Sequence, residues 1–352
     1  MIQRRHFLGS VAAVFATSAS LPRFVSAARS TDELNWSGEV IESVPHDRSL
    51  RSPVVTGVSL QPNGQQMAVV GDDHYVCIYD TQTQQFNVHL NRHSDWVRAA
   101  RFSPDGRKLV TAGNDRKLLI WDVDRWTPPA IEKRHPEAII EVAFSRDGRK
   151  LATVGFEESL RIYDAQSGSP QTRLRCACPD NHAVAFSNDD KWIAAGGRCG
   201  NIRVWETANS RQLVQFKAHR QRIRSIEFTS DGKILSAGDD QLVKITDPLS
   251  PAQAKSFPRH ASKLYATALL DDGLVATAGS DNKIHIWQLS DLQEVGTLTG
   301  HTGTVSCLDF SGGKLVSGSY DTHVRVWNTE RHTSAPQQRH TQLGNGWNRK
   351  LN

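Results

Sequence analysis

The stretch Gly300-His301-Thr-Gly-Thr-Val-Ser-Cys-Leu-Asp-Phe310, continued by Lys314-Leu-Val-Ser-Gly-Ser-Tyr-Asp321 and Val324-Arg-Val-Trp327, decides the fold of this chain. Turn residues separate its short apolar segments, as is typical of strands joined by hairpins. An aromatic residue ends the stretch and recurs every 40 to 42 residues, with one replacement by threonine, at Tyr79, Trp121, Tyr163, Trp205, Thr246, Trp287 and Trp327. A period of this length predicts an all-β fold of repeated four-stranded blades.

The Gly-His start and Trp end of these units resemble the WD-repeat β-propeller family over residues 39–330. This resemblance implies a single seven-bladed propeller of four-stranded antiparallel blades, each unstable without its neighbours. Glu39-Val40-Ile41-Glu42-Ser43 reads as a fourth strand with no blade before it, whereas no strand is expected after Trp327. We therefore expect residues 39–44 to complete the last blade beside the strand that ends at Trp327.

In this family a His, a Ser or Thr, an Asp and a Trp of one blade form a buried hydrogen-bond chain. Three blades match this tetrad in full: His93, Thr111, Asp115 and Trp121; His260, Thr277, Asp281 and Trp287; and His301, Ser317, Asp321 and Trp327. The same residue types make catalytic triads. Their recurrence once per blade, beside a Trp, favours a structural role. The fourth unit, with Ala195, Cys199 and Trp205 and no His in place, is expected to be the least rigid.

The sequence carries no Walker loop, zinc-protease, nucleophile-elbow or dinucleotide motif. We also find no ring of convergent carboxylates or histidines outside the tetrads. The chain is therefore predicted to be no enzyme and to need no cofactor or metal.

Partner-binding residues are implied by the resemblance, because the family builds its binding face from two turn positions per blade. One position flanks the start of the inner strand, and the other precedes the turn Asp. Here these positions combine aromatic residues with cations: Trp96, Arg98, Phe156, Arg198, Arg222, Arg224, Lys263, Tyr265 and Tyr320. Aromatic residues and Arg are enriched in binding cores. The alternative is that they are ordinary loop residues around a channel mouth.

Charge is concentrated at the two ends of the chain. Of the net +5, residues 1–27 carry +3 and residues 331–352 carry +4, which leaves −2 for residues 28–330. The basic balance is thus a weak indicator of nucleic-acid binding. We predict a disordered basic tail at 331–352 and no nucleic-acid partner.

The N-terminus looks like a twin-arginine (Tat) export signal, with Arg4-Arg5-His6-Phe7-Leu8 before a weakly apolar stretch. Gly9 to Leu21 is too short for a membrane span, and small residues up to Ala27 offer a cleavage site. We expect a signal peptide at 1–27, a linker at 28–38, and a bacterial monomer that is periplasmic or secreted. The alternative is a disordered basic leader on a cytosolic protein.

Five cysteines are present: Cys77, Cys176, Cys178, Cys199 and Cys307. Cys176-Ala177-Cys178 has poor spacing for a disulfide, and no second pair completes a zinc set. We predict that these thiols are unpaired small apolar residues.

These observations favour an exported scaffold that binds protein, with an acidic segment as the expected partner of the Arg-containing face. Two alternatives remain open. One is an extracytoplasmic propeller enzyme or small-ligand receptor that uses the channel mouth, and the other is a receptor for an anionic polymer.

Overall fold

A computed structural model describes residues 35–42, 52–126, 128–176 and 179–330. Their strands form seven four-stranded antiparallel sheets, and no α-helix occurs among them. The predicted all-β fold with seven blades is therefore confirmed. The proposed signal peptide, residues 28–34 of the linker and the tail 331–352 lie outside the described residues.

The first three blades follow one another along the chain. Blade 1 contains β2 (Val55–Leu60), β3 (Gln66–Gly71), β4 (Tyr75–Asp80) and β5 (Phe86–Asn91). Blade 2 contains β6 (Val97–Phe102), β7 (Lys108–Gly113), β8 (Lys117–Asp122) and β9 (Ile131–Arg134). Blade 3 contains β10 (Ile139–Phe144), β11 (Lys150–Gly155), β12 (Ser159–Asp164) and β13 (Pro170–Arg175).

The next three blades repeat this order from the innermost strand outwards. Blade 4 contains β14 (Asn181–Phe186), β15 (Trp192–Gly197), β16 (Asn201–Glu206) and β17 (Gln212–Lys217). Blade 5 contains β18 (Ile223–Phe228), β19 (Ile234–Gly238), β20 (Val243–Thr246) and β21 (Lys255–Ser256). Blade 6 contains β22 (Leu264–Leu269), β23 (Leu274–Gly279), β24 (Ile284–Gln288) and β25 (Glu294–Leu298). Two 3-10 turns, Pro251–Gln253 and Asp271–Gly273, are the helical elements described.

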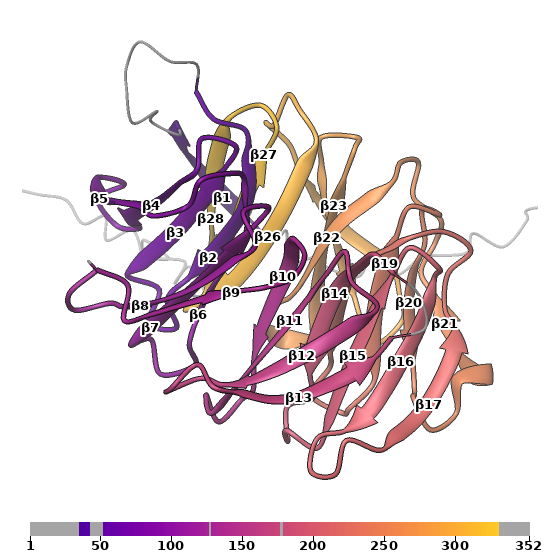
Figure 1. Cartoon of the computed structure of the whole chain (residues 1–352). Coiled ribbons are helices and arrows are strands. Elements are labelled where there is room, and N and C mark those ends of the chain that lie inside the picture. Colours follow the sequence, from indigo (N-terminus) through magenta and orange to yellow (C-terminus); the bar gives the residue numbers. More distant parts are fainter. Residues whose placement is uncertain (1–34, 43–51, 127, 177–178, 331–352) are drawn as a thin grey trace, which may run out of the picture. The chain divides into compact units, whose positions relative to one another are not determined.

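Blade 7 joins the two ends of the described chain. It contains β26 (Val305–Ser311), β27 (Lys314–Ser319), β28 (His323–Glu330) and, as its outer strand, β1 (Asn35–Glu42). Figure 1 shows indigo β1 beside yellow β28, with Asn35 opposite Glu330 and Glu42 opposite His323. Closure by residues 39–42 is confirmed. The strand starts at Asn35, so residues 35–38, which the sequence assigns to the linker, extend it because β28 also continues to Glu330.

The seven innermost strands contact one another in a closed cycle, from β2 through β6, β10, β14, β18 and β22 to β26 and back to β2. Adjacent blades bury each other's faces. For example, Trp121 of blade 2 shares one apolar cluster with Val70 and Ile78 of blade 1. Ile41 of β1 packs with Val55 and Val58 of the first blade, so the closing strand is part of the core.

The propeller has two faces, which are named here by their connections. The hairpin face carries the turns between the first and second strands of each blade, such as Ser103–Arg107. The loop face carries the segments that lead into each inner strand, such as Arg92–Trp96, and the turns between second and third strands. β28 runs antiparallel to β27, so Asn328 lies opposite Lys314 and β28 ends at the hairpin face. Its partner β1 begins at the same face.

Candidate functional site

Two of the three predicted tetrads form the expected chain of side chains. In blade 2, His93 Nδ1 lies 2.9 Å from Asp115 Oδ2, and its Nε2 lies 2.9 Å from Thr111 Oγ1. The Trp121 indole donates to the same hydroxyl at 2.9 Å. Blade 7 repeats this arrangement with His301, Ser317, Asp321 and Trp327. These side chains are buried, and their polar groups serve one another.

The third predicted tetrad is wrong at its histidine. Trp287 donates to Thr277 at 2.9 Å, but among the described residues no hydrogen bond joins His260 to Thr277 or Asp281, and its buried Nε2 has no hydrogen-bond partner. His285 takes its place, with Nε2 at 2.9 Å from Asp281 and Nδ1 at 2.7 Å from Glu294. The Asp281 carboxylate is thus paired with His285, which lies two residues before Trp287. Burial, followed by the nearby charge of His285, lowers the pKa of His260 to about 4.

Two other blades keep part of the chain with different residues. His219 Nδ1 lies 2.8 Å from Asp240, and its Nε2 lies 2.9 Å from Ser236, although Thr246 replaces the Trp. In blade 3 the hydroxyl of Tyr163 lies 2.7 Å from His135 Nε2. The aromatic residue therefore contacts the His directly, without the Ser or Thr hydroxyl that joins them in blades 2 and 7. Buried hydrogen bonds at the tetrad positions therefore recur in most blades, as the sequence pattern predicts.

The two predicted binding positions of each blade meet on the loop face. A backbone N–H of the second position donates to the carbonyl of the first in all seven blades: Asp72 to Val54, Asn114 to Trp96, Phe156 to Ala138, Arg198 to Asp180, Asp239 to Arg222, Ser280 to Lys263, and Tyr320 to Thr304. Glycine precedes the donor in six blades, because a Cβ there would strike the same carbonyl, at 2.1 Å for Gly113.

Aromatic side chains are exposed on this face. Trp96, Phe156 and Tyr320 are 39%, 47% and 45% exposed, and they come from blades 2, 3 and 7. Tyr265 is half-buried. Exposed large apolar side chains near one another mark interaction surfaces more often than isolated ones do. The structure thus gathers the aromatic residues on one face and leaves three of them accessible.

The cations of this face are less free than the sequence suggests. Arg222 Nη2 lies 2.7 Å from Asp180 Oδ2, and Arg224 forms a two-pronged pair with Asp239 at 2.7 and 3.1 Å. Arg98 donates to Asn114 at 2.9 Å and stacks over Trp96 at 4.7 Å. The Arg224 guanidinium also lies 5.0 Å above the Tyr265 ring. In the described part of the chain, Arg198 and Lys263 are exposed and form no ion pair.

Asp180 connects blade 4 to blade 5 at this face. It adopts a left-handed backbone conformation with φ of 67°, which Asp tolerates better than most residues. Its Oδ1 lies 2.6 Å from His182 Nε2, and its Oδ2 holds Arg222. Burial lowers the pKa of His182 to about 4, so this imidazole is neutral at pH 7. The carboxylate of Asp180 therefore serves Arg222 as its charged partner.

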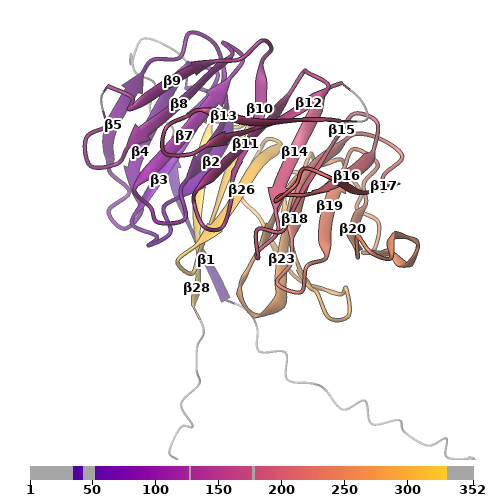
Figure 2. The same ribbon diagram turned by 60° about the horizontal axis from the view of Figure 1, so that its bottom comes forward.

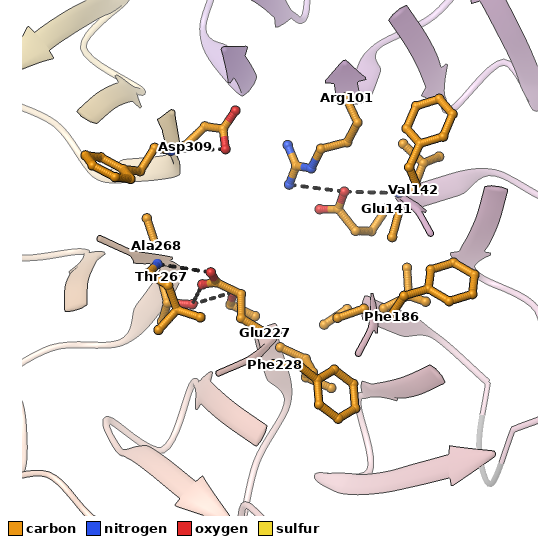
Figure 3. Close-up of a pocket in the computed structure, with 18 of the residues that line it drawn as sticks. Arg101, Glu141, Val142, Phe186, Glu227, Phe228, Thr267, Ala268 and Asp309 are labelled. Carbon is orange, nitrogen blue, oxygen red and sulfur yellow. Dashed lines mark hydrogen bonds and ion pairs between the residues drawn. The ribbon is translucent and has the colours of Figure 1, made fainter. Parts of the chain in front are cut away.

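The central channel contains a charged group that the sequence analysis missed. Figure 3 shows Arg101, Glu141, Glu227 and Asp309, from the inner strands of four blades, projecting into a cavity of about 750 Å³. Arg101 Nη2 lies 3.3 Å from Glu141 Oε1. Burial raises the pKa of all three carboxyl groups, while that of Arg101 rises because its carboxylate neighbours outweigh burial. The expectation of no convergent carboxylates is thus wrong.

The four charged residues of the channel occupy two different positions of the inner strand. Arg101, Glu227 and Asp309 are fifth in their strands, whereas Glu141 is third, and the other blades carry small residues there. Both positions face the channel, since alternate residues of a strand share one side. Among the described residues, no group of three His, Cys, Asp or Glu side chains is arranged to hold a metal ion.

The cysteines differ from the prediction at one position. Cys77, Cys176 and Cys307 are free and buried, but Cys199 is disulfide-bonded. Cys199 occupies the turn position where blades 2, 5, 6 and 7 carry the tetrad Asp. Blade 4, which lacks the His–Asp pair, therefore has a disulfide at this turn. Cys178 lies outside the described residues.

Comparison with known proteins places the chain in a family. Six segments match the WD40 repeat, described as "WD domain, G-beta repeat": residues 44–80, 84–122, 177–206, 210–247, 252–288 and 292–328. They cover more than half of the chain, which therefore belongs to the WD40 repeat family. Strands β10–β13 lie outside these segments yet form a complete blade, with Glu157 and Tyr163 where blades 2, 6 and 7 have Asp and Trp.

Curated relatives match over single short stretches. A U3 snoRNP-associated protein-like protein of Arabidopsis thaliana is 42% identical over 52 residues, which is 14% of this chain and 11% of the relative. The Periodic tryptophan protein 2 homolog of Neurospora crassa is 46% identical over 59 residues, 16% of this chain and 7% of the relative. Mitochondrial division protein 1 of Mycosarcoma maydis is 39% identical over 44 residues, 12% and 5% respectively. The chain thus aligns with about a tenth or less of each relative.

No helix in the described part of the chain has the length and apolar character needed to cross a membrane.

Proposed function

We propose that this protein is a non-catalytic scaffold that binds another protein through the loop face. The observation that carries the proposal is the exposure of Trp96, Phe156 and Tyr320 around one channel mouth. Aromatic side chains contribute large contact areas at low entropic cost, and WD40 propellers generally serve protein interaction. The relatives are named for different assemblies, so they support the repeat and indicate no particular partner.

The partner segment is acidic and contains an apolar residue. Arg198 and Lys263 present charge without an ion-pair partner among the described residues, and Arg98 lies against Trp96. A carboxylate next to an apolar side chain would meet both kinds of group. Arg222 and Arg224 contribute less, because Asp180 and Asp239 already neutralise them.

The scaffold acts outside the cytoplasm of a bacterium, as a monomer exported through the Tat route. Arg4-Arg5 and the weakly apolar stretch after them support this assignment. The disulfide at Cys199 supports it independently, because disulfides persist in oxidising compartments. Replacing both arginines by Lys should keep the full chain in the cytoplasm, as fractionation and immunoblotting would show. Unchanged export would remove this part of the proposal.

The binding face is tested with two matched triple variants of the purified protein. W96A/F156A/Y320A removes the exposed aromatics of the loop face, and F86A/L249A/V295A removes exposed apolar residues elsewhere. Cross-linking in native periplasm identifies the partner, and binding to the purified partner is then measured by calorimetry. We expect at least a tenfold loss of affinity in the first variant alone.

The acidic character of the partner is tested with R198Q/K263Q. We expect weaker binding and a flatter dependence on salt than for the wild type, because rim charges act mainly through screened attraction. Equal binding of a simple polyanion such as heparin, with the same salt dependence, would favour the anionic-polymer receptor instead. A partner that resists every loop-face variant would place the binding surface elsewhere.

A further inference from the structure

Charge is divided unevenly around the outside of the propeller. The outer half of a blade is defined here as its third and fourth strands with the turn between them. In blades 2 to 5 these segments, 117–134, 159–175, 201–217 and 243–256, contain twelve Lys or Arg and six Asp or Glu. In blades 6, 7 and 1 the outer halves contain one Arg and six Asp or Glu. The circumference therefore has a basic arc of four adjacent blades and an acidic arc of three.

Neighbouring carboxylates do not neutralise the basic arc. Five of its cations pair with Glu132, Glu157, Glu158 or Glu206. Glu157 and Glu158 belong to the adjoining turn of blade 3, so with them twelve cations face eight acids. The other seven cations form no ion pair within the described residues: Arg125, Lys133, Arg134, Arg203, Lys217, Lys244 and Lys255.

The accessible cations of the arc are arranged as a row. Arg134, Arg175 and Lys217 are exposed, and each ends the fourth strand of its blade. Each also lies opposite the first residue of the third strand, so the three positions are equivalent. Figure 2 shows β9, β13 and β17 following one another across the upper part of the view, with β1 and β28 below them.

Blade 3 presents two cations on its outermost strand. The Arg175 side chain is 85% exposed, and that of Arg173 is 64% exposed. Alternate residues of a strand share one side and lie about 7 Å apart. Their ion pairs are long, at 3.7 Å to Glu158 and 3.9 Å to Glu157, and Glu157 is bound more closely by Arg161 at 2.7 Å. Exposed pairs of this kind are weak, so both guanidinium groups are available to an external anion.

The form of the arc favours a flexible polymer as its occupant. The blades form a closed ring, so their outer strands lie on a convex surface. A DNA duplex is stiff over about 150 base pairs and would touch such a surface at one blade. A rigid second copy, docking through its acidic arc, would do the same. A flexible chain with repeated anionic groups follows several blades and meets the row of cations.

The side chains beside the cations favour a glycan over a single-stranded nucleic acid. Leu249 is the exposed large apolar residue of the basic arc within the described part of the chain. The arc thus offers no exposed aromatic side chain on which a base could stack, and such stacking supplies much of the affinity for single strands. Arginine pairs strongly with carboxylates and related oxyanions without any apolar contact.

We propose that the basic arc of blades 2 to 5 binds an anionic polysaccharide, a flexible glycan that carries carboxylate or sulfate groups. Arg134, Arg175 and Lys217 are its principal contacts. Each exposed contact is weak alone, so affinity comes from several blades that hold one chain together. The arc is separate from the aromatic residues of the loop face, and the glycan leaves that face open for a protein partner.

The test compares two matched triple variants of the full chain. R134Q/R175Q/K217Q removes the row of cations, whereas R107Q/R146Q/K191Q removes two Arg and one Lys from exposed hairpin turns of the same three blades. Both variants change the net charge equally. Calorimetry at about 100 mM salt measures binding to heparin, a sulfated glycan, and to polygalacturonate, a carboxylated one. We expect at least a tenfold loss of affinity in R134Q/R175Q/K217Q and less than a threefold loss in R107Q/R146Q/K191Q.

Controls separate this site from the loop face. R198Q/K263Q should bind the glycans as the wild type does, so the failure of one proposal is distinguishable from the failure of the other. Uncharged dextran should not bind. Melting curves confirm folding, and R134Q/R175Q, which keeps the bond from Lys217 to the Cys199 carbonyl, replaces the triple variant if that is unstable. Binding of either glycan with the expected difference supports the proposal, and the one bound identifies the anionic group.

Three outcomes would overturn the proposal. Equal binding by the two triple variants would place the glycan on another part of the chain. Preference for polyglutamate or duplex DNA over both glycans would exclude a polysaccharide as the occupant. A salt-sensitive dimer without glycan binding, seen by sedimentation and abolished in R134Q/R175Q/K217Q, would assign the basic arc to the acidic arc of a second copy.

Discussion

Competition between two histidines distinguishes blade 6 from its neighbours. His285 lies between Asp281 and Glu294. Its ring N–H groups donate hydrogen bonds to both carboxylates, and these bonds, that to Asp281 first, raise its pKa. His260 packs edge-on against its ring at a centroid distance of 5.3 Å and against Trp287 at 4.9 Å. A second cation beside charged His285 would be repelled, so His260 remains neutral in the folded protein.

We expect His260 to make the protein labile to mild acid. Its pKa falls from 6.5 to about 4 on folding, through burial first and the charge of His285 second, against the weaker opposing effect of Asp281 and Glu294. Below pH 6.5 the unfolded chain takes up the proton first, so stability declines as the pH falls from 6.5 to about 4. The difference corresponds to about 3 kcal/mol.

His260→Phe keeps the ring contacts and removes the titration. Urea unfolding of both proteins between pH 7.5 and pH 4 measures the effect, and the variant should lose less stability over this window. His182 titrates in the same sense, but it is present in both proteins and cancels in the difference. Parallel curves for wild type and variant would show that His260 does not couple to folding.

The sequence predicts a tetrad where one residue type fills one repeated position. Trp121, Thr111 and His93 follow this rule, because the strand pattern alone brings them together. His285 does not, since whether it or His260 reaches Asp281 depends on the packing of side chains from two strands. The channel acids escaped detection for a related reason. Glu141 and Glu227 occupy different positions of their strands, so no period reveals that they converge.

At the scale of the strand, Gly38 is the point where ring closure is most sensitive. It lies opposite Trp327 in the pairing of β1 with β28, and a Cβ there would lie 2.5 Å from the indole ring. Gly38→Val should therefore push β1 away from blade 7 and cost about 1–3 kcal/mol of unfolding free energy. Chemical denaturation measures the change.

Gly296 provides the control for this substitution. It lies in β25, the outer strand of blade 6, opposite Ile286, and a Cβ there would meet nothing within 4 Å. Gly296→Val should change stability by about 0.5 kcal/mol or less. Similar losses in both variants would mean that the outer strand tolerates valine poorly in general and that closure at Gly38 is not special.

The disulfide at Cys199 is expected to stabilise blade 4, which has no His–Asp pair at that turn. Reduction should lower the unfolding free energy by about 2–4 kcal/mol, the range typical of a native disulfide. Cys199→Ser should show the lower stability with or without reductant. Burial raises the pKa values of Cys77, Cys176 and Cys307, which keeps these thiols unreactive in the folded protein. A wild-type melting curve that does not change with reductant would contradict the stabilisation expected from the disulfide at Cys199.

At the scale of the whole propeller, the pair Arg222–Asp180 couples blade 5 to blade 4. The Arg222 side chain is 28% exposed and that of Asp180 is 12% exposed, so the pair is partly desolvated. Arg222→Gln and Asp180→Asn should each cost about 1–3 kcal/mol, between the values for surface and buried pairs. Asn suits the backbone of Asp180 because it tolerates positive φ.

A double-mutant cycle isolates this coupling from other effects. The double variant D180N/R222Q should be more stable than the sum of the single losses predicts, because neither charge is then left without its partner. Arg198→Gln, on the same face and without an ion pair among the described residues, should leave stability unchanged. Strict additivity would mean that the two blades are held together here by packing alone.

The number of blades was predictable because one residue position repeats through the whole chain, and closure was predictable because Val40 and Ile41 form a strand without a blade. The pairing of the loop-face arginines with acidic residues was not predictable. Asp180 and Asp239 lie 42 and 15 residues from the arginines that they neutralise, and the sequence does not show which cations of a ring meet which acids.

The pairing of β1 with β28 sets an order of events during synthesis. β1 leaves the ribosome first, yet its partner follows about 290 residues later, which takes about 15–60 s at ordinary rates of translation. Throughout that interval the growing chain is an open arc with unpaired strand edges at both ends, a state prone to association with other chains. The last strand made is therefore the one that ends this exposure, and a ribosome that stalls before β28 would release an arc that cannot close.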